Sequence, residues 1–305
     1  MKPRINIIYL DNGVGLSRDA IILANTLSDY DVKLIDANKM TFNKVDVNLI
    51  LETLNFNTFN IKKLKNYAKV NYLIPNQEWF FRKWIPDLQY IDKVLCKTKD
   101  AVRIFSSLGC RCEYISFTSE DRYIKSEKIL EFFHGAGKSE TKGTDLIINT
   151  WNCMLKKPKL SLCKYNKIYP GIDGITFYNR RIDNNIFKEM QNKFVFHLCP
   201  SSCEGFGHYI NEAKSCGNLV LTLDAPPMNE FITNEFGVLV GCNSNSNHHL
   251  AKMYTTSTEL LGNSVEYLIN LNSNTIKSMM KKSRESFLLN DKFFKEKINK
   301  IFKDG

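Results

Sequence analysis

The sequence lacks the patterns that mark disulfide-stapled, zinc-binding and membrane-spanning chains. Its nine cysteines form no repeated C-x-x-C pair, and the closest spacings are Cys110/Cys112 and Cys199/Cys203. Such cysteines in 305 residues indicate neither a small disulfide scaffold nor a zinc ribbon. The apolar run near the N-terminus is too short for a signal peptide, and no window reaches membrane-spanning length. We therefore expect a soluble, cytoplasmic protein.

Two nucleotide-binding fingerprints are incomplete. Gly13 and Gly15 form a G-x-G, but Arg18 stands where a dinucleotide-binding loop has its third glycine. The Gly-Lys-Ser at residues 137–139 suggests a P-loop, but that motif needs a glycine at the position of Phe132. A dinucleotide-binding fingerprint is thus unsupported, and a P-loop NTPase is a distant alternative.

Acidic residues are fewer than basic ones, and about half of the +10 net charge lies in the last tenth of the chain. A basic tail can contact nucleic acid or the surface of a membrane, but a solvated helix face is the interpretation we favour. Phe294, Ile298 and Ile301 share one face of such a helix. Its N-cap is expected at Asn290 or Asp291.

Apolar runs alternate with helical patterns along the chain, which predicts parallel sheets with helices on both faces. The strands of a first series are expected at 5–10, 32–35, 47–51, 70–74, 94–96 and 114–116, and those of a second at 130–133, 160–163, 167–169, 194–198, 219–223 and 238–240. A mostly polar segment, 118–128, serves as linker. We expect one domain over 1–125, a second over 126–285, and an amphipathic helix over 286–305 that packs on a domain.

The stretch 194–232 organises the chain. Its pattern predicts a buried strand, a loop at 200–207 and then a helix, with Glu204 on the loop and Glu212 on the helix. A glycine-containing loop that opens a helix aims backbone N–H groups and the positive helix end at a bound anion. Two carboxylates beside an anion site suit a ligand with both phosphates and hydroxyls, such as a nucleotide sugar.

A second anion site is predicted at residues 134–143, HGAGKSETKG, between a strand and a helix. Lys138 and Lys142 supply point charges that can neutralise a phosphate leaving group. Taken singly, either lysine is also explained by ordinary solvation of a loop.

Together the motifs resemble glycosyltransferase group 1, the retaining GT-B-fold enzymes that use nucleotide sugars. The 194–232 stretch has their E-x7-E pair, their Glu-Gly-Phe-Gly, Glu-Ala at 212–213, Gly217 before a new strand and Glu230 in a later helix. GAGKSETKGTDLIINTW, residues 135–151, is similar to their phosphate-binding loop, and residues 12–15 are similar to their N-terminal glycine loop. The resemblance implies an α/β fold in which two Rossmann-like, doubly wound domains face a central cleft.

The resemblance also implies roles for single residues of the second domain. Glu212 would hold the ribose hydroxyls of the donor. Glu204 would lie near the sugar, and the amides of Phe206 and Gly207 would face the donor. Lys142 would stabilise the departing diphosphate, so Glu204 and Lys142 are the expected catalytic residues.

Other glycines and one lysine complete the implied donor site. Gly135 and Lys138 would belong to the donor-binding loop, while Gly13 and Gly15 would let the first domain close on the donor. The implied reaction retains the anomeric configuration. It needs no metal or other cofactor, because lysine and helix-end charge replace the metal.

Two departures from the family concern charge and the acceptor. An arginine that the family places after the first glycine of the phosphate loop is replaced by Ala136, and we expect Lys138 to supply the missing charge. The family often has a histidine near the sugar in its first domain, but no histidine precedes His134. Of the remaining histidines, we interpret His197 as structural and expect His208 to face the cleft.

The loop after residue 74 is the best acceptor-side candidate. Asn76 and Glu78 bring polar groups beside Trp79, whose ring could stack on a sugar. The alternative is that Trp79 belongs to the core and Glu78 caps the next helix. Lys97 and Thr98 follow a neighbouring strand and are weaker candidates.

The leading hypothesis is a glycosyltransferase that moves a sugar from a nucleotide-sugar donor to a glycan, lipid or other acceptor. One alternative is a sugar-nucleotide binding protein without turnover, which the missing histidine and arginine favour. Another is a glycosyltransferase acting on nucleic-acid bases, which only the basic charge favours, and whose binding would weaken steeply with salt.

Overall fold

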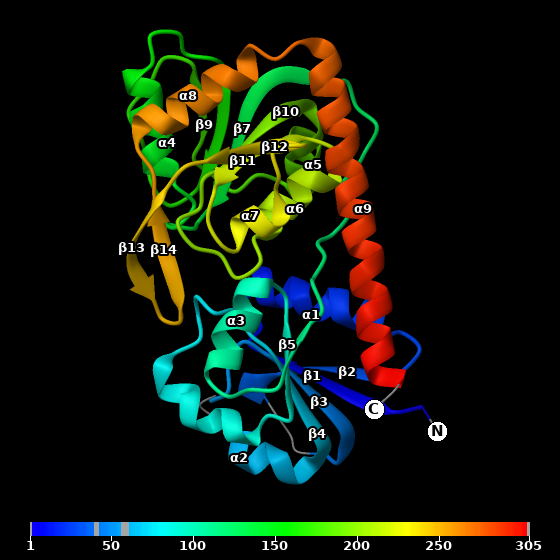
Figure 1. Cartoon of the computed structure of the whole chain (residues 1–305). Helices are drawn as coiled ribbons and strands as arrows, with labels where there is room; N and C mark the ends of the chain where they lie inside the picture. The colour runs from blue at the N-terminus through cyan, green and yellow to red at the C-terminus, as the bar shows by residue number, and fades with distance from the viewer. Residues whose placement is uncertain (1, 40–42, 56–60, 304–305) are drawn as a thin grey trace.

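The computed structural model describes residues 2–39, 43–55 and 61–303. Residue 1 of the predicted first domain and residues 304–305 of the predicted C-terminal helix lie outside the described residues. The chain forms two parallel six-stranded sheets, one above the other in Figure 1. This confirms the predicted α/β class of two doubly wound domains.

The first sheet has the strand order β2-β1-β3-β4-β5-β6. Its strands are β1 (Arg4–Tyr9), β2 (Asp31–Asp36), β3 (Val45–Leu51), β4 (Ala68–Ile74), β5 (Lys93–Cys96) and β6 (Cys112–Tyr114). The connecting helices are α1 (Gly15–Thr26), α2 (Ile61–Leu64) and α3 (Lys99–Ser107), with short 3-10 helices at Ala37–Lys39, Lys65–Tyr67 and Arg82–Tyr90. The apolar residues in the second halves of β3 and β4, 49–51 and 72–74, are buried because helices cover both faces of the sheet.

The second sheet has the order β12-β11-β10-β7-β8-β9. Its strands are β7 (Ile129–Gly137), β8 (Leu160–Lys164), β9 (Ile175–Tyr178), β10 (Phe194–Cys199), β11 (Leu219–Leu223) and β12 (Gly237–Val240). Its helices are α4 (Thr144–Cys153), α5 (Asn184–Lys193), α6 (His208–Ser215), α7 (Met228–Phe231) and α8 (Thr258–Ile269). The strand order reverses between β7 and β10, and ligands of open parallel sheets bind at such a point.

One predicted strand is absent, and one observed hairpin was not predicted. Residues 167–169 form no strand, because the apolar character there lasts too few residues and Lys167 and Tyr169 instead bind Asp145. An antiparallel hairpin, β13 (Asn243–His248) and β14 (Ala251–Thr255), was not expected. Its first strand, NSNSNH, has no apolar alternation that would indicate a strand.

The C-terminal helix is longer than predicted. Helix α9 runs without a break from Ser273 to Lys303, so the N-cap expected at Asn290 or Asp291 was wrong. Both side chains instead bind the segment between the sheets: the hydroxyl of Ser116 donates to Asn290 (2.6 Å) and that of Thr118 to Asp291 (2.9 Å). The predicted apolar face is confirmed, since Phe294, Ile298 and Ile301 are buried.

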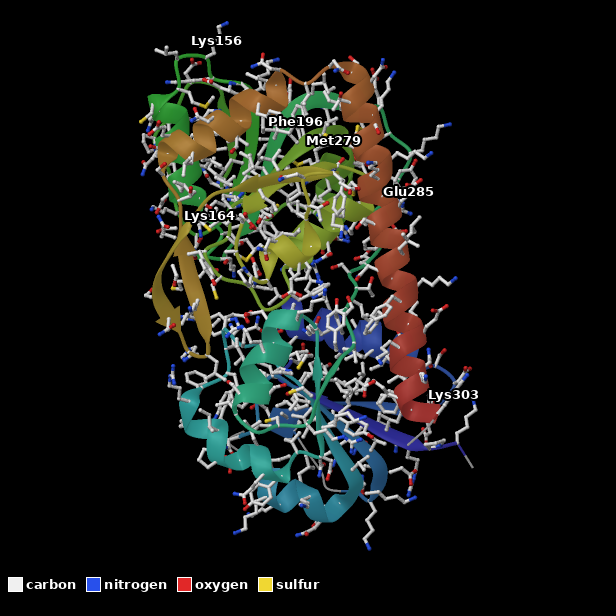
Figure 2. The ribbon with its side chains drawn as sticks, in the orientation of Figure 1. Lys156, Lys164, Phe196, Met279, Glu285 and Lys303 are labelled. Atoms are coloured by element: carbon white, nitrogen blue, oxygen red, sulfur yellow. The ribbon has the colours of Figure 1, made fainter. Side chains whose placement is uncertain are left out.

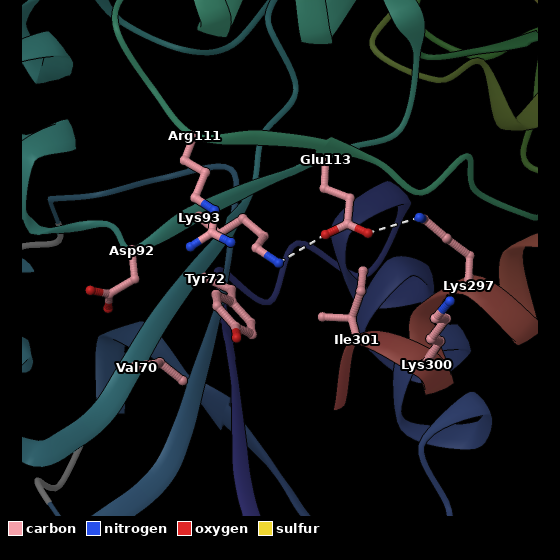
Figure 3. A pocket seen from close by; sticks show the side chains of 9 residues that line it. All are labelled: Val70, Tyr72, Asp92, Lys93, Arg111, Glu113, Lys297, Lys300 and Ile301. Carbon is pink, nitrogen blue, oxygen red and sulfur yellow. Dashed lines mark hydrogen bonds and ion pairs between the residues drawn. The ribbon is translucent and has the colours of Figure 1, made fainter. Parts of the chain in front are cut away.

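Helix α9 runs alongside both sheets (Figure 1). In Figure 2, Met279 points from α9 into the second domain, whereas Glu285 points away from it. At the other end, the Glu113 carboxylate binds Lys93 and Lys297, each at 2.8 Å, beside a hollow of about 390 Å³ (Figure 3). Part of the basic character of the tail is therefore neutralised within the fold. Across the described ranges, no helix is both long and apolar enough to cross a bilayer.

Candidate active site

The two predicted anion-binding loops meet because β7 and β10 are neighbouring strands. The backbone N–H of Ser202 donates to the carbonyl of Thr141 at 2.8 Å, which joins the loop after β10 to the loop after β7. Gly143 makes this approach possible. It has φ +73°, and a Cβ there would lie 2.4 Å from the carbonyl oxygen of Pro200.

Glu204 lies in the second of these loops. Its Oε1 accepts a hydrogen bond from Ser201 at 2.5 Å, and Ser201 also binds the hydroxyl of Tyr209. Burial raises the pKa of Glu204, while the nearby charge of Lys142 opposes that rise. The Lys142 ammonium lies 4.0 Å from the centroid of the Tyr209 ring. The structure therefore places the two expected catalytic residues close together.

A lysine that sequence analysis missed forms hydrogen bonds to the loop predicted to bind phosphate. Lys164, at the end of β8, is buried and donates to the carbonyl of Ser139 (2.7 Å) and to Glu140 (2.9 Å). Lys138 is exposed, by contrast. The sequence did show a lysine at the end of an apolar strand, which could have indicated a buried charge. No motif, however, linked Lys164 to residues 138–143.

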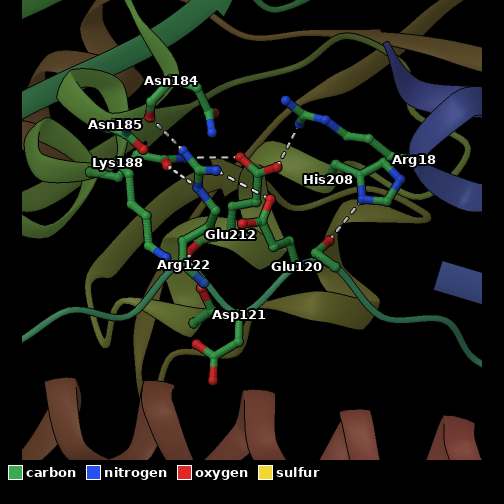
Figure 4. Close-up of polar contacts among 12 residues, drawn as sticks. Arg18, Glu120, Asp121, Arg122, Asn184, Asn185, Lys188, His208 and Glu212 are labelled. Atoms are coloured by element: carbon green, nitrogen blue, oxygen red, sulfur yellow. Dashed lines mark hydrogen bonds and ion pairs between the residues drawn. The ribbon is translucent and has the colours of Figure 1, made fainter. Parts of the chain in front are cut away.

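Glu212 on α6 makes contacts in both domains. Its carboxylate accepts from Arg18 of α1 at 2.7 Å and from Gln191 at 2.8 Å (Figure 4). The buried Arg122 in turn donates to Gln191 at 2.9 Å. Arg18 is 48% exposed and the Glu212 side chain only 6%, so the arginine is the partner that can leave.

Behind this contact lies a polar network that crosses the cleft. Asp19 of α1 binds Lys97 (2.5 Å) and His208 (2.7 Å), and His208 also bonds to Ser119 (2.9 Å). Asp19 and Lys97 are each 3% exposed. His208 therefore faces the first domain, but it does not line the cavity described below.

The three loops after β3, β4 and β5 come together on the first domain. Asn76 donates to Glu52 at 2.7 Å and accepts from Lys97 at 3.0 Å. Glu52 has φ +64°, an uncommon conformation for a non-glycine residue. Sequence analysis did not single out Glu52, because one glutamate after a strand carries no motif.

Glu78 lies against the Glu-Gly-Phe-Gly loop of the other domain. A Cβ at Gly205 would lie 2.5 Å from its Oε2, so a side chain there would displace the Glu78 carboxyl. The Glu78 side chain is partly exposed along its length, but Oε2 is buried and has no hydrogen-bond partner. Burial, followed by the negative charge of Glu52, raises the pKa of Glu78 to about 8.

The elevated pKa of Glu78 predicts a pH-dependent stability. Its folded pKa lies above the ordinary value of 4.5, so the folded state binds a proton that the unfolded state has lost. We therefore expect the wild-type free energy of unfolding to decline relative to that of Glu78→Gln as the pH rises toward about 8. Urea unfolding at pH 6, 7, 8 and 9 measures this difference, with the exposed Glu259→Gln as control. Parallel profiles for wild type and Glu78→Gln would contradict it.

A cavity of about 110 Å³ lies between the domains. Its lining combines Lys142 and Glu204 with the acceptor-side candidates Glu78 and Trp79, and includes Ser139, Thr141, Cys203 and His248. Trp79 is 49% exposed, so the alternative that it belongs to the core was wrong. His248 was not predicted, because it lies on the unexpected hairpin.

Several predicted donor residues lie outside that lining. Gly13 and Lys138 are exposed, and Gly15 opens α1. Gly135 lies within β7, and the side chain of Phe206 packs in the core. Gly207 has φ +72° and directly precedes α6, so the backbone there leads into the helix.

The remaining histidines of the second sheet are structural. Burial lowers the pKa of His134 to about 4 and that of His197 to about 3, so both rings are neutral near pH 7. His134 bonds to Thr144 and to the carbonyl of Leu198, which ties β7 to α4 and β10. The interpretation of His197 as structural is confirmed. No three His, Cys, Asp or Glu side chains gather in a metal-binding group within residues 2–39, 43–55 and 61–303.

Residues 156–256 match the family model described as glycosyl transferases group 1. No curated protein sequence matches the chain.

Solved structures share the fold at low sequence identity. A glycosyltransferase from Rickettsia africae superposes with a TM-score of 0.73 at 12% identity, over 99% of this chain and 98% of that one. Anabaena HepE in complex with UDP and glucose gives 0.71 at 11% identity, over 99% and 100%. The pneumococcal O-GlcNAc transferase GtfA, in complex with UDP and GlcNAc, gives 0.65 at 13% identity over 86% of this chain, which spans 57% of GtfA. The chain therefore has the GT-B fold, and its residues 156–256 are similar to glycosyl transferases group 1.

Proposed function

We propose that this chain is a retaining, metal-independent glycosyltransferase that takes a sugar from a nucleotide-sugar donor. The observation that carries the proposal is the cavity where Lys142 and Glu204 of one domain face Glu78 and Trp79 of the other. It lies at the carboxyl ends of β7 and β10, where the strand order of the second sheet reverses.

The donor's diphosphate would bind beside Lys142 and the N-terminus of α4. In the reaction, the bond between the anomeric carbon and the diphosphate oxygen breaks, and its electron pair leaves with the diphosphate. The acceptor oxygen bonds to the same face of that carbon, and its proton passes to the departing phosphate oxygen. Lysine and the helix end stabilise the negative charge that develops on the leaving group.

Glu212 would bind the ribose hydroxyls in exchange for its bond to Arg18. The exchange is available because Arg18 is half-exposed and can turn to solvent, while Gln191 continues to hold the second carboxylate oxygen. HepE and GtfA are solved with UDP, which supports uridine nucleotides as the first donors to test.

A thermal-shift panel of nucleoside diphosphates and nucleotide sugars tests the proposal. A ligand that binds only the folded state at 100 times its Kd adds about 2.7 kcal/mol of stability, so the correct donor raises the Tm. Glu212→Gln is expected to weaken binding about 10-fold or more, since hydrogen bonds to charged groups contribute about 1.5–3 kcal/mol. The exposed Glu266→Gln should behave as wild type. A panel without any shift would contradict the proposal.

A sugar-nucleotide binding protein without turnover is the second candidate. It is favoured by Ala136 in place of the family's arginine and by the absence of a histidine before His134. Donor hydrolysis in the absence of acceptor separates the two. A transferase hydrolyses its donor slowly and loses that activity in Glu204→Gln. A binding protein gives the same background in both proteins.

A further inference from the structure

Buried polar atoms without partners concentrate in the cleft. Among the described residues these atoms are Gln77 Oε1, Glu78 Oε2, Asn179 Oδ1 and His248 Nε2. Glu78 and His248 line the same cavity, and Gln77 is next to Glu78 in the chain. Leaving such a group unpaired costs about 1–3 kcal/mol. Two of them in one cavity therefore indicate where polar groups of a ligand bind.

The β13–β14 hairpin extends from the second domain toward the first (Figure 1), and His248 is the last residue of β13. The N–H of Leu250 in its turn donates to the carbonyl of Gln77 at 3.2 Å, and the N–H of Tyr254 donates to Ser202 at 2.8 Å. The ring of His248 meets that of Trp79 edge to face at 5.3 Å. Because no histidine precedes His134, the imidazole at this place can come only from the second domain.

The chemistry of this corner suits a saccharide. Trp79 offers a half-exposed ring, on which the apolar face of a pyranose can stack. The buried oxygens and nitrogen beside it can exchange hydrogen bonds with hydroxyls that project from the rim of such a ring.

We propose that the β13–β14 hairpin completes an acceptor site for a saccharide, in which Glu78 and His248 bind acceptor hydroxyls and Trp79 stacks on the ring. The inference rests on the proposed glycosyltransferase function and assigns its acceptor class. His248 is the specificity-determining residue that the hairpin adds to the first domain's loop.

Tryptophan fluorescence can measure ligand binding at this site. The chain has three tryptophans, and Trp84 and Trp151 are 5% and 0% exposed, so Trp79 is the one that meets solvent. Methyl glycosides of glucose, galactose, mannose and N-acetylglucosamine are titrated in the presence of the nucleoside diphosphate that gives the largest thermal shift. At least one glycoside is expected to give a saturable change, which Trp79→Phe removes.

Variants separate hydroxyl binding from packing. His248→Phe keeps the ring contact with Trp79 but removes Nε2, and Glu78→Leu removes the carboxyl. Each is expected to weaken glycoside binding about 10-fold or more, while the Kd for the nucleoside diphosphate changes less than twofold. His248→Gln, whose amide can replace Nε2, should recover part of the affinity. Lys252→Ala is the control, because Lys252 is exposed on the same hairpin and does not line the cavity.

The outcomes distinguish this inference from the function on which it rests. If no nucleoside diphosphate binds, the proposed function fails. If one binds but no glycoside does, or if glycosides bind His248→Phe as tightly as wild type, only the acceptor assignment is overturned. A fluorescence change with phosphatidylglycerol vesicles or single-stranded DNA that His248→Phe removes would also overturn the saccharide class.

Discussion

Lys142→Ala is expected to lower the rate of sugar transfer by about 10²–10³-fold, the usual loss when one preorganised group that stabilises developing charge is removed. Lys142 lies in the loop that opens α4, and its ammonium group packs against the Tyr209 ring of α6. Together with Glu204 it lines the cavity. Its positive charge stabilises the departing diphosphate, whose negative charge grows as the bond to the sugar breaks. The effect should therefore appear in kcat more than in the affinity for the donor.

Single-turnover donor hydrolysis and transfer measure this loss, with the nucleoside diphosphate Kd determined in parallel. Lys138→Ala tests whether that lysine supplies the charge missing at Ala136. A smaller loss than for Lys142→Ala is expected, because Lys138 is exposed and outside the cavity lining. Lys159→Ala, remote and 79% exposed, is the neutral control. Equal turnover in wild type and Lys142→Ala would contradict the assigned role.

Lys97→Met is expected to lower the free energy of unfolding by up to about 3–5 kcal/mol, the usual cost of removing one member of a buried ion pair. Asp19 then keeps only its contact with His208. Lys97 and Asp19 are almost fully buried, and the charge of Lys97 lowers the pKa of Asp19 against the opposing effect of burial. Asn76 also loses the donor to its Oδ1. The loss therefore reaches both the core of the first domain and its acceptor-side loop.

Urea unfolding with a double-mutant cycle measures this contribution. Lys97→Met with Asp19→Asn should cost less than the sum of the two single changes, because the pair couples directly. Lys281→Ala, which removes an exposed i,i+4 pair with Glu285, should change stability by less than about 0.5 kcal/mol. Strict additivity of Lys97→Met and Asp19→Asn would contradict direct coupling.

Periodic, local features were readable from the sequence. Buried parallel strands such as β10 and β11 appear as uninterrupted apolar runs, and the glycines that open α4 and α6 mark the loops between strand and helix. The fold class followed from these signals, whereas the joint roles of Lys142 and Glu204 were implied by the resemblance to glycosyltransferase group 1. The hairpin escaped, because Asn and Ser in β13 carry no apolar alternation.

What only the tertiary structure decided is how the two domains complete one another. The sequence by itself determined two doubly wound domains, the loops that end β7 and β10, and the carboxylates and lysine on them, because each is set by a local pattern. Packing decided that Arg18 pairs with Glu212, that Glu78 lies on Gly205, and that His248 reaches the acceptor loop. These contacts join residues more than a hundred positions apart, and no local pattern encodes such a distance.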